Sequence, residues 1–198
     1  MTRTSHCPVT KGINLLSLPN VPKDGALIVD DVPKCELTEL EKRDVLLQKG
    51  DLLFNWRNGS SEHLGKTAYF DLEGEWTHVS FLLRLRFDST KSDSRYFQYM
   101  LNGLRLTGFF ISSKAGVNNT FNLNELMNLW IINPPRLEQK EIAEYLDSWL
   151  KELNGMAIQI NEAIAKLKEY RTALITNAVT GKIDVRDVIL ELEPVEAA

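Results

Sequence analysis

The sequence predicts an α+β fold, in which a globular domain is followed by one long helix that forms a coiled coil. Within residues 1–136, short apolar runs alternate with polar segments containing glycine or proline, which is typical of mixed strands and short helices. Residues 137–181 contain no proline, and their apolar residues recur every three or four positions, as in a long helix packed along another. We expect three parts: a domain over 1–136, a helix over 137–181 and a tail over 182–198.

The first part of the domain is expected to hold little regular structure before residue 45. Four prolines interrupt any long helix there: Pro8, Pro19, Pro22 and Pro33. Residues 44–56, DVLLQKGDLLFNW, then predict a strand, a turn at Lys49–Asp51 and a second strand. The polar segment RNGSSEHLGK, residues 57–66, predicts a loop.

The second part of the domain is expected to be more regular. Residues 78–88 alternate apolar and polar side chains and predict a half-buried strand, with Phe81 on its apolar face and Arg84 and Arg86 on its polar face. Ser94 is the expected N-cap of the helix that follows. Residues 107–132 then predict a short strand, a polar loop over 112–120, a short capped helix and a final strand.

The long helix carries an apolar seam that is held for about five heptads. A helix over residues 137–178 would be about 60 Å long, so it cannot bury this seam on its own domain and needs a partner helix. Arg171 breaks the seam and can set its register, and Gly181 is placed to end the helix. The seam residues expected to face the partner helix are Leu146, Leu150, Leu153, Ile160, Ile164, Leu167 and Leu174.

Composition argues against several classes of protein. No apolar run reaches the roughly 18 residues of a membrane helix, and the start lacks the apolar core of a signal peptide, so we expect a cytoplasmic protein with no membrane segment. Cys7 and Cys35 are too few for a disulfide framework or a zinc site, so we expect neither metal nor any other cofactor. The net charge of −4 does not indicate nucleic-acid binding. Residues 76–120, however, hold six basic and two acidic residues, a balance that suits phosphate neutralisation and an ordinary solvated surface equally well.

Residues 133–136, Asn-Pro-Pro-Arg, come close to the Asn-Pro-Pro-aromatic motif of enzymes that methylate amino groups on DNA bases. Such enzymes need the aromatic residue to stack on a flipped base, and they need a glycine-containing turn for the methyl donor. Arg136 takes the aromatic position, and no FxGxG or GxGxxG occurs. We therefore interpret Pro134 and Pro135 as a rigid entry to the long helix. His63 and His78 lack the neighbours of an activated nucleophile, so no catalytic residue is expected.

Three segments together resemble the DNA-specificity (S) subunits of type I restriction–modification systems. Residues 133–147, NPPRLEQKEIAEYLD, and residues 163–187, AIAKLKEYRTALITNAVTGKIDVRD, are similar to the two ends of the conserved helical region in that family. Residues 49–70, KGDLLFNWRNGSSEHLGKTAYF, are similar to a segment of its target-recognition domains. A typical member has two recognition domains and two long helices, whereas this sequence has one of each and lacks the usual opening tryptophan segment. The resemblance therefore implies either a half-size subunit or a recognition domain whose first strand comes from elsewhere.

The resemblance also implies a function. The chain would be a non-enzymatic subunit that recognises double-stranded DNA and directs methyltransferase subunits to a bipartite site, and it leaves open whether restriction subunits join the complex. In the family the long helices pair antiparallel as a spacer, so a half-size chain would act as a homodimer or beside a different half. The alternative is a coiled-coil assembly module whose domain binds a protein or ligand and has no DNA role.

The residues expected to contact DNA are polar or basic and gather in two loops and on one strand face. The first loop offers Asn55, Arg57, Asn58, Ser60, Ser61 and Lys66, and the second offers Lys114, Asn118, Asn119 and Thr120. Arg84, Arg86 and Arg95 are expected at phosphates. The candidates for partner docking are Glu138, Gln139, Tyr170 and Arg171, which also suit the first turn of a helix and helix-pair packing, respectively.

Overall fold

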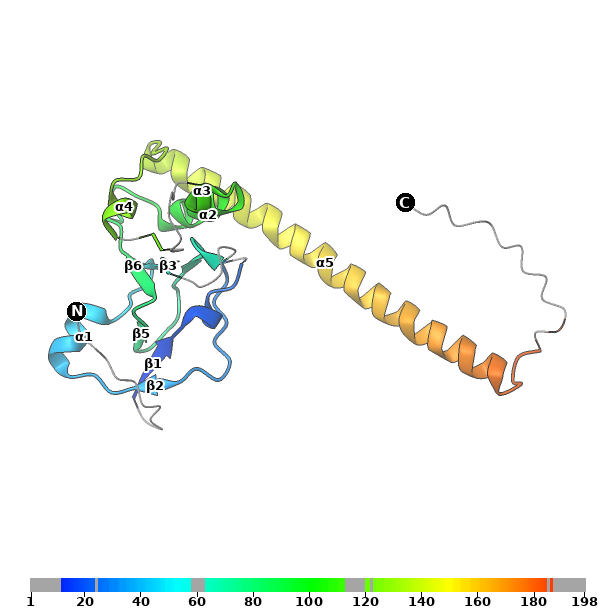
Figure 1. Ribbon diagram of the computed structural model, residues 1–198. Coiled ribbons are helices and arrows are strands. Elements are labelled where there is room, and N and C mark those ends of the chain that lie inside the picture. Colours follow the sequence, from blue (N-terminus) through cyan, green and yellow to red (C-terminus); the bar gives the residue numbers. More distant parts are fainter. Residues whose placement is uncertain are drawn as a thin grey trace. The chain divides into compact units, whose positions relative to one another are not determined.

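In the computed structural model, the residues described are 12–23, 25–57, 63–112, 120–121, 123–184 and 186 (Figure 1). The chain separates into two compact units, residues 1–145 and 146–198. The first unit holds all strands among the described residues, and the second holds most of the long helix α5 (Arg136–Val179). The predicted α+β fold class with a long C-terminal helix is confirmed.

Two three-stranded sheets form the centre of the first unit. One has the order β2–β1–β5, with β1 antiparallel to β2 and parallel to β5. The other has the order β4–β3–β6 and is antiparallel throughout. The strands are β1 (Ile13–Leu16), β2 (Lys34–Cys35), β3 (Leu52–Asn55), β4 (Thr67–Tyr69), β5 (Trp76–His78) and β6 (Leu82–Leu85).

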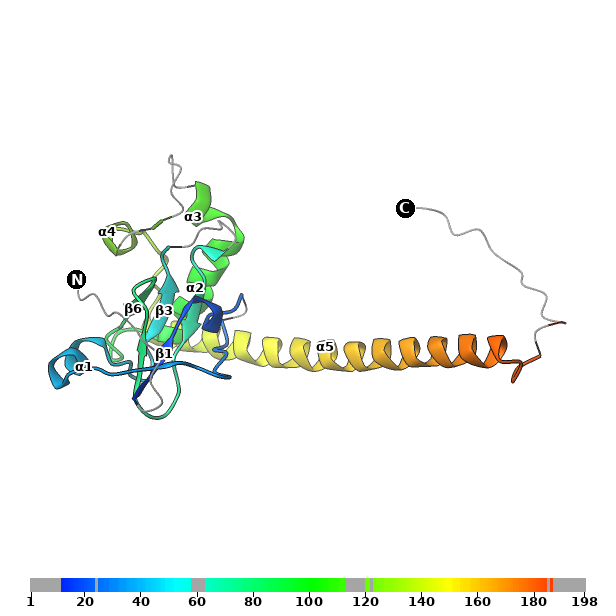
Figure 2. The same cartoon turned by 60° about the horizontal axis from the view of Figure 1, so that its bottom comes forward.

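Strand β3 is buried on both faces and serves two hydrophobic cores. Leu52 and Phe54 point into one core, which α2 (Ser94–Leu106) covers (Figures 1 and 2). Leu53, on the opposite face, packs into a second core together with Trp76 of β5. A strand covered on both sides needs apolar residues at successive positions rather than in alternation, which explains the run Leu-Leu-Phe.

Short helices fill the connections between the strands. They are the 3₁₀ turn η1 (Leu18–Asn20), α1 (Glu39–Val45), α3 (Phe109–Ser112) and α4 (Leu123–Met127). Helix α1 starts with a capping box, in which the Thr38 amide donates to Glu41 Oε2 at 2.9 Å and the Glu41 amide donates to Thr38 Oγ1 at 3.3 Å. Helix α2 is capped by Asp93, whose Oδ1 accepts from the amides of Arg95 and Tyr96, so the expected cap at Ser94 is one residue off.

The start of α5 is fixed to the domain by a buried amide. Gln139 is fully buried; its Oε1 accepts from the Asp93 amide at 2.8 Å, and its Nε2 donates to Asn133 Oδ1 at 2.9 Å and to the Pro134 carbonyl at 2.8 Å. The helix begins directly after Pro135, which confirms the two prolines as its entry. At the other end, Gly181 adopts φ +71 and the Lys182 amide donates to the Asn177 carbonyl, a Schellman termination.

Several predicted elements are wrong. Residues 44–48 are not a strand, because α1 runs to Val45 and the chain then extends to the turn at Lys49–Gly50. Residues 107–111 do not form a strand either, since α3 begins at Phe109, and residues 128–135 carry none. The single strand expected over 78–88 is divided between β5 and β6 by a turn at 80–81. Before residue 45 the chain holds β1, β2 and α1, which the prolines flank rather than prevent.

None of the described helices has the length and apolar character that a membrane crossing requires. In the same part of the chain, no group of three or more His, Cys, Asp or Glu side chains is arranged to hold a metal ion.

Candidate nucleic-acid interface

The first predicted loop leaves the end of β3 and is closed at its base by backbone hydrogen bonds. The Asn55 amide donates to the Lys66 carbonyl at 2.8 Å, and the Gly65 amide donates to the Asn55 carbonyl at 2.9 Å. Gly65 has φ +82, and a Cβ there would lie 2.3 Å from the Phe110 ring, so only glycine allows this close approach. The loop is therefore held on a rigid base between β3 and β4.

The second predicted loop ends beside the start of the first. Arg57 and Thr120 form an isolated antiparallel bridge, and the Phe121 amide donates to the Trp56 carbonyl at 2.7 Å. Phe121 is buried, and its ring packs edge-on against Phe110 with centroids 5.2 Å apart. Residues 57 and 120, which are far apart in sequence, thus share one edge of the domain.

Arg57 is the exposed basic residue at this junction. Its guanidinium carbon lies 5.9 Å from the centroid of the Phe81 ring, and the Trp56 indole donates to the Ser80 carbonyl at 2.7 Å. The sequence placed Phe81 on the buried face of a strand, but its side chain is 43% exposed. Because residues 81–83, Phe-Leu-Leu, are all apolar, the sequence does not tell which of them face the core. The turn at 80–81 decides that Phe81 faces outward beside Arg57.

The other residues of the two loops divide by burial. Asn55 is 1% exposed, and its Oδ1 has no hydrogen-bond partner among the described residues. Lys66 is 8% exposed. Arg57 is exposed and Thr120 is half-buried. The remaining predicted loop contacts lie outside the described residues: Asn58, Ser60, Ser61, Lys114, Asn118 and Asn119.

The three arginines expected at phosphates do not join this junction. Strands β3 and β6 pair Asn55 with Leu82 and Leu52 with Leu85, so Arg86 lies toward the start of β3 and Arg57 beyond its end. Arg86 donates through Nε and Nη2 to the two carboxylate oxygens of Asp51, each at 2.6 Å, and Asp51 is 1% exposed. This hydrogen-bonded carboxylate raises the pKa of Arg86.

Arg84 and Arg95 also have partners within the domain. Arg84 donates to the Leu46 carbonyl at 3.0 Å, and burial, followed by the charge of Arg86, lowers its pKa. The Arg95 guanidinium lies 5.1 Å from the centroid of the Tyr69 ring and 5.5 Å from that of Tyr99. Arg95 also donates to the Tyr99 hydroxyl at 3.3 Å. These contacts give Arg84 and Arg95 a role within the fold.

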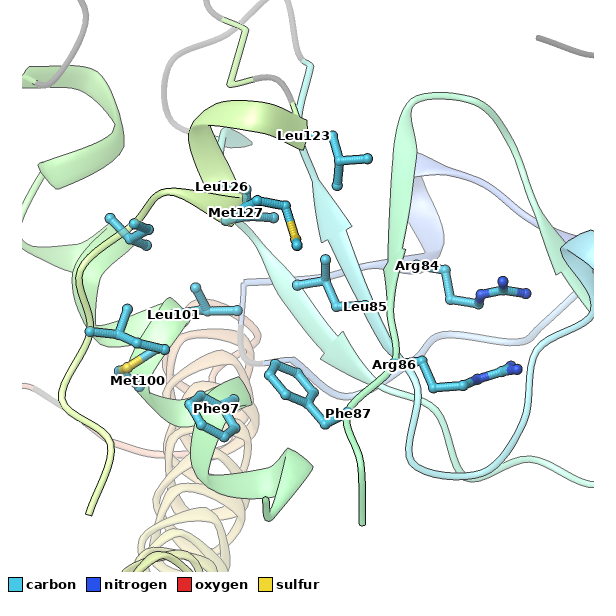
Figure 3. A pocket seen from close by; sticks show the side chains of 12 residues that line it. Arg84, Leu85, Arg86, Phe87, Phe97, Met100, Leu101, Leu123, Leu126 and Met127 are labelled. Carbon is cyan, nitrogen blue, oxygen red and sulfur yellow. The ribbon is translucent and has the colours of Figure 1, made fainter. Parts of the chain in front are cut away.

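An apolar cavity of about 340 Å³ lies on the side of β6 that faces away from the Arg84 and Arg86 side chains. Figure 3 shows Leu85 and Phe87 turned toward it, whereas Arg84 and Arg86 point to the opposite side of the strand. Phe97 and Leu101 of α2 and Met127 of α4 complete much of its lining (Figure 3). None of the described residues that line the cavity is a carboxylate, histidine or cysteine, the usual acids, bases and nucleophiles of a catalytic site.

The residues predicted for the helix differ in their exposure. The seam residues are half-buried at Leu146 and exposed at Leu150, Leu153, Ile160, Ile164, Leu167 and Leu174. Glu138, Tyr170 and Arg171 are exposed, whereas Gln139 is buried in its hydrogen bonds to Asp93, Asn133 and Pro134. Of the four candidates for partner docking, Gln139 is thus occupied within the chain.

Known proteins match this chain in sequence and in fold. The chain is 27% identical over 168 residues to the type I restriction enzyme StySPI specificity subunit of Salmonella potsdam, covering 81% of this chain and 35% of that protein. It is 31% identical over 134 residues to the putative MjaX specificity subunit of Methanocaldococcus jannaschii, covering 66% and 30%. The chain spans about a third of the length of these curated relatives.

Two solved structures share the fold. The crystal structure of the HsdS subunit from Thermoanaerobacter tengcongensis matches with a TM-score of 0.60 and 20% identity, over 92% of this chain and 41% of that one. A chain from a structural study of complex assembly and conformational transition in the type I R-M system matches with a TM-score of 0.68 and 20% identity, over 90% and 41%. The family model described as type I restriction modification DNA specificity domain matches residues 32–166. Because this match covers more than half of the sequence, the chain belongs to the type I restriction–modification DNA-specificity family.

Proposed function

We propose that this chain recognises a DNA sequence for a type I restriction–modification complex, as a non-catalytic subunit that directs methyltransferase subunits to a bipartite site in cytoplasmic DNA. The Arg57–Thr120 bridge is the observation that carries the proposal, because it brings the two polar loops to one edge of the domain. Sequence-specific contacts in the major groove rely on paired hydrogen bonds from arginine, lysine, asparagine and glutamine. The two loops hold side chains of these kinds at Arg57, Asn58, Lys114, Asn118 and Asn119.

In this proposal base contacts come from the Arg57 edge. Arg84, Arg86 and Arg95 stay candidates for phosphate contacts, which position a protein on DNA without reading its sequence. Each of the three already donates hydrogen bonds within the domain, so replacing any of them also changes stability. Arg57 is the cleaner probe of DNA recognition, because its contact with the described part of the chain is to the Phe81 ring, whereas Arg86 is paired with a buried carboxylate.

The α5 seam supports pairing with a second copy. Its apolar residues repeat as a heptad, and in the described single chain most of them are exposed. A parallel pair in register would place Arg171 against its own copy in the seam, two like charges in an apolar layer. An antiparallel pair in which Leu153 faces Ile164 of the partner subunit avoids this, because it places Arg171 against Leu146 of the partner subunit.

The charges beside the seam suit the same antiparallel register. When Leu153 faces Ile164 of the partner subunit, Asp147 comes opposite Lys168 of the partner subunit, a pair of opposite sign. Two recognition domains related by a two-fold axis would read an interrupted palindrome, with the helix length setting the gap. Glu138 and Tyr170, which are exposed, remain the proposed contacts for methyltransferase subunits, whereas Arg171, also exposed in the single chain, would lie in the seam of this helix pair.

The proposal is tested by mapping methylated adenines genome-wide in the native host, with and without this gene. We expect an interrupted palindrome to lose its methylation on deletion and to regain it on complementation. Loss of an asymmetric motif would indicate that the chain works beside a different half. If no motif changes while the methyltransferase is expressed, the proposal fails and a coiled-coil assembly module without a DNA role takes its place.

Arg57 is then tested on the motif identified. Replacing Arg57 by alanine should weaken binding to that motif by about 1–3 kcal/mol and relax the preference at one base position. Arg43→Ala is the matched control, because Arg43 is exposed on α1 and outside both loops. Binding is measured at several salt concentrations, since phosphate contacts alone change the salt dependence. Equal binding of the two variants to every motif variant would remove Arg57 from the interface.

A further inference from the structure

Phe81 is a large apolar side chain at the tip of a tight turn, where small polar residues are usual. The Leu82 amide donates to the Val79 carbonyl at 3.0 Å and closes the turn. Ser80 and Phe81 are its two central residues. Such positions favour glycine, asparagine, aspartate and serine, and the Phe81 side chain is 43% exposed. The turn itself therefore gives no reason for a phenylalanine at this position.

The backbone on both sides of Phe81 is fixed to the domain. On one side, the Trp56 indole donates to the Ser80 carbonyl at 2.7 Å. On the other side, Leu82 is 1% exposed and pairs with Asn55 in the ladder between β3 and β6. A side chain whose backbone is already ordered loses less conformational entropy when it contacts a ligand. The outward Phe81 ring is thus prepared for a contact outside the domain.

The Phe81 ring lies at the edge of the domain where the two polar loops meet. The guanidinium carbon of Arg57 is 5.9 Å from the ring centroid, and Arg57 forms the bridge to Thr120 that joins the loops. Arg57 is exposed as well. A planar group of hydrogen-bond donors and an apolar ring therefore stand side by side on one exposed edge.

The major groove of DNA offers a partner to each member of this pair. Guanine presents two acceptors, O6 and N7, to an arginine, and thymine presents its 5-methyl group, which phenylalanine is among the side chains to contact. Successive base pairs are about 3.4 Å apart along the duplex. A ring centred 5.9 Å from the guanidinium carbon of Arg57 therefore lies one or two base-pair steps from the base that Arg57 contacts.

We propose that Phe81 is a specificity-determining residue, which contacts the 5-methyl group of a thymine one or two base pairs from the base contacted by Arg57. This inference rests on the proposed DNA recognition at the Arg57 edge. Burial of one methyl group against the ring strengthens binding about fourfold. The sequence preference of this edge then comes from the turn at 79–82 as well as from the two polar loops.

The test replaces thymine by uracil, which pairs with adenine through the same hydrogen bonds and lacks only the methyl group. Synthetic duplexes carry the motif found on the methylation map, and each thymine is changed to deoxyuridine in turn. The full-length chain, together with its methyltransferase subunits, is titrated with each duplex and with a scrambled duplex. The position that Arg57 contacts is the one where Arg57→Ala relaxes the base preference.

We expect the wild-type chain to bind about fourfold more weakly when the uracil lies one or two base pairs from that position. Phe81→Ala should bind the thymine and uracil duplexes equally. Phe81→Leu should keep the preference for thymine, because leucine retains an apolar surface although it lacks the ring beside Arg57. The matched control, Leu106→Ala, removes a side chain that is 75% exposed at the end of α2 and should leave the preference unchanged.

Several results would overturn the inference while the proposed function stands. One is a motif that is preferred over the scrambled duplex but has no thymine within two base pairs of the Arg57 position. Others are equal wild-type binding to thymine and uracil there, or a preference for thymine that survives Phe81→Ala. A preference that Phe81→Leu loses as completely as Phe81→Ala would show that the ring acts only through Arg57.

A different pattern separates the failure of the proposed function. If the wild-type chain binds the motif and the scrambled duplex equally, DNA recognition itself is absent and the inference falls with it. If the motif is preferred but Arg57→Ala relaxes no position, Arg57 is not at the interface. The role of Phe81 beside it is then refuted, although DNA recognition remains.

Discussion

The buried amide of Gln139 makes a direct prediction about how the helix is joined to the domain. Replacing it by leucine keeps the volume but removes three hydrogen bonds, to the Asp93 amide, Asn133 Oδ1 and the Pro134 carbonyl. At about 1 kcal/mol for each bond, the free energy of unfolding should fall by about 3 kcal/mol. For a unit of this size the loss corresponds to a fall in melting temperature of roughly 6–12 °C.

Urea denaturation at a fixed protein concentration measures this change, because dimer stability depends on concentration. Glu138→Ala is the control: the neighbouring side chain is exposed and should change stability by less than about 0.5 kcal/mol. Gln139→Glu separates packing from hydrogen bonding, since a carboxylate at 139 still accepts from Asp93 but faces the two oxygens of Asn133 and Pro134. Equal midpoints for Gln139→Leu and Glu138→Ala would refute the structural role of Gln139.

Three further predictions follow from other parts of the chain. Arg86→Ala should lower the free energy of unfolding by about 1–3 kcal/mol, because it leaves Asp51 buried without its cation. This loss should be smaller in an Asp51→Asn background. If the two losses are additive in a double-mutant cycle, the ion pair is contradicted. Burial is the main cause that lowers the pKa of His78 below its ordinary value of about 6.5. The stability that comes from burying the neutral imidazole is therefore fully present above a pH of about 6.5. It is lost as the pH falls from there through the lower pKa of His78 in the folded state, because the unfolded chain takes up the proton first. The wild-type chain should therefore lose more stability than His78→Gln between pH 7 and 5, and parallel pH profiles of the denaturation midpoint would disprove this. Inserting one heptad within residues 146–174 should lengthen the gap in the recognised motif on the methylation map, whereas an unchanged gap would show that the helix does not set it.

The contacts of Gln139 and Arg86 show that a polar residue in this chain has to be examined for a role within the fold as well as for a role in binding. Both residues are of kinds that bind DNA or partner proteins, and the sequence predicted them as such contacts. Each also satisfies a buried group within the domain, the Asp93 amide in the case of Gln139 and the Asp51 carboxylate in the case of Arg86. A buried polar group without a partner costs more than a surface contact contributes, so these side chains are committed to the fold first.

The sequence by itself determined the features whose signal is local. The heptad seam and the Pro-Pro entry predicted the long helix to within one residue at its start and two at its end, because helical periodicity and backbone restriction act between near neighbours. The α+β class also followed from local patterns. The capping box at Thr38 and Glu41 was likewise present in the sequence and could have predicted α1, which was interpreted there as irregular chain.

Only the tertiary structure decided which distant residues meet. The bridge between Arg57 and Thr120 depends on Phe121 packing into the core beside Phe110, a contact that no local pattern encodes. The antiparallel register of β3 and β6 placed Arg86 at Asp51, away from the loop junction. The periodicity of a sequence indicates which face of a helix or strand is apolar. Which other element packs on that face depends on the packing of the whole domain, and the position of the candidate DNA surface depends on that packing.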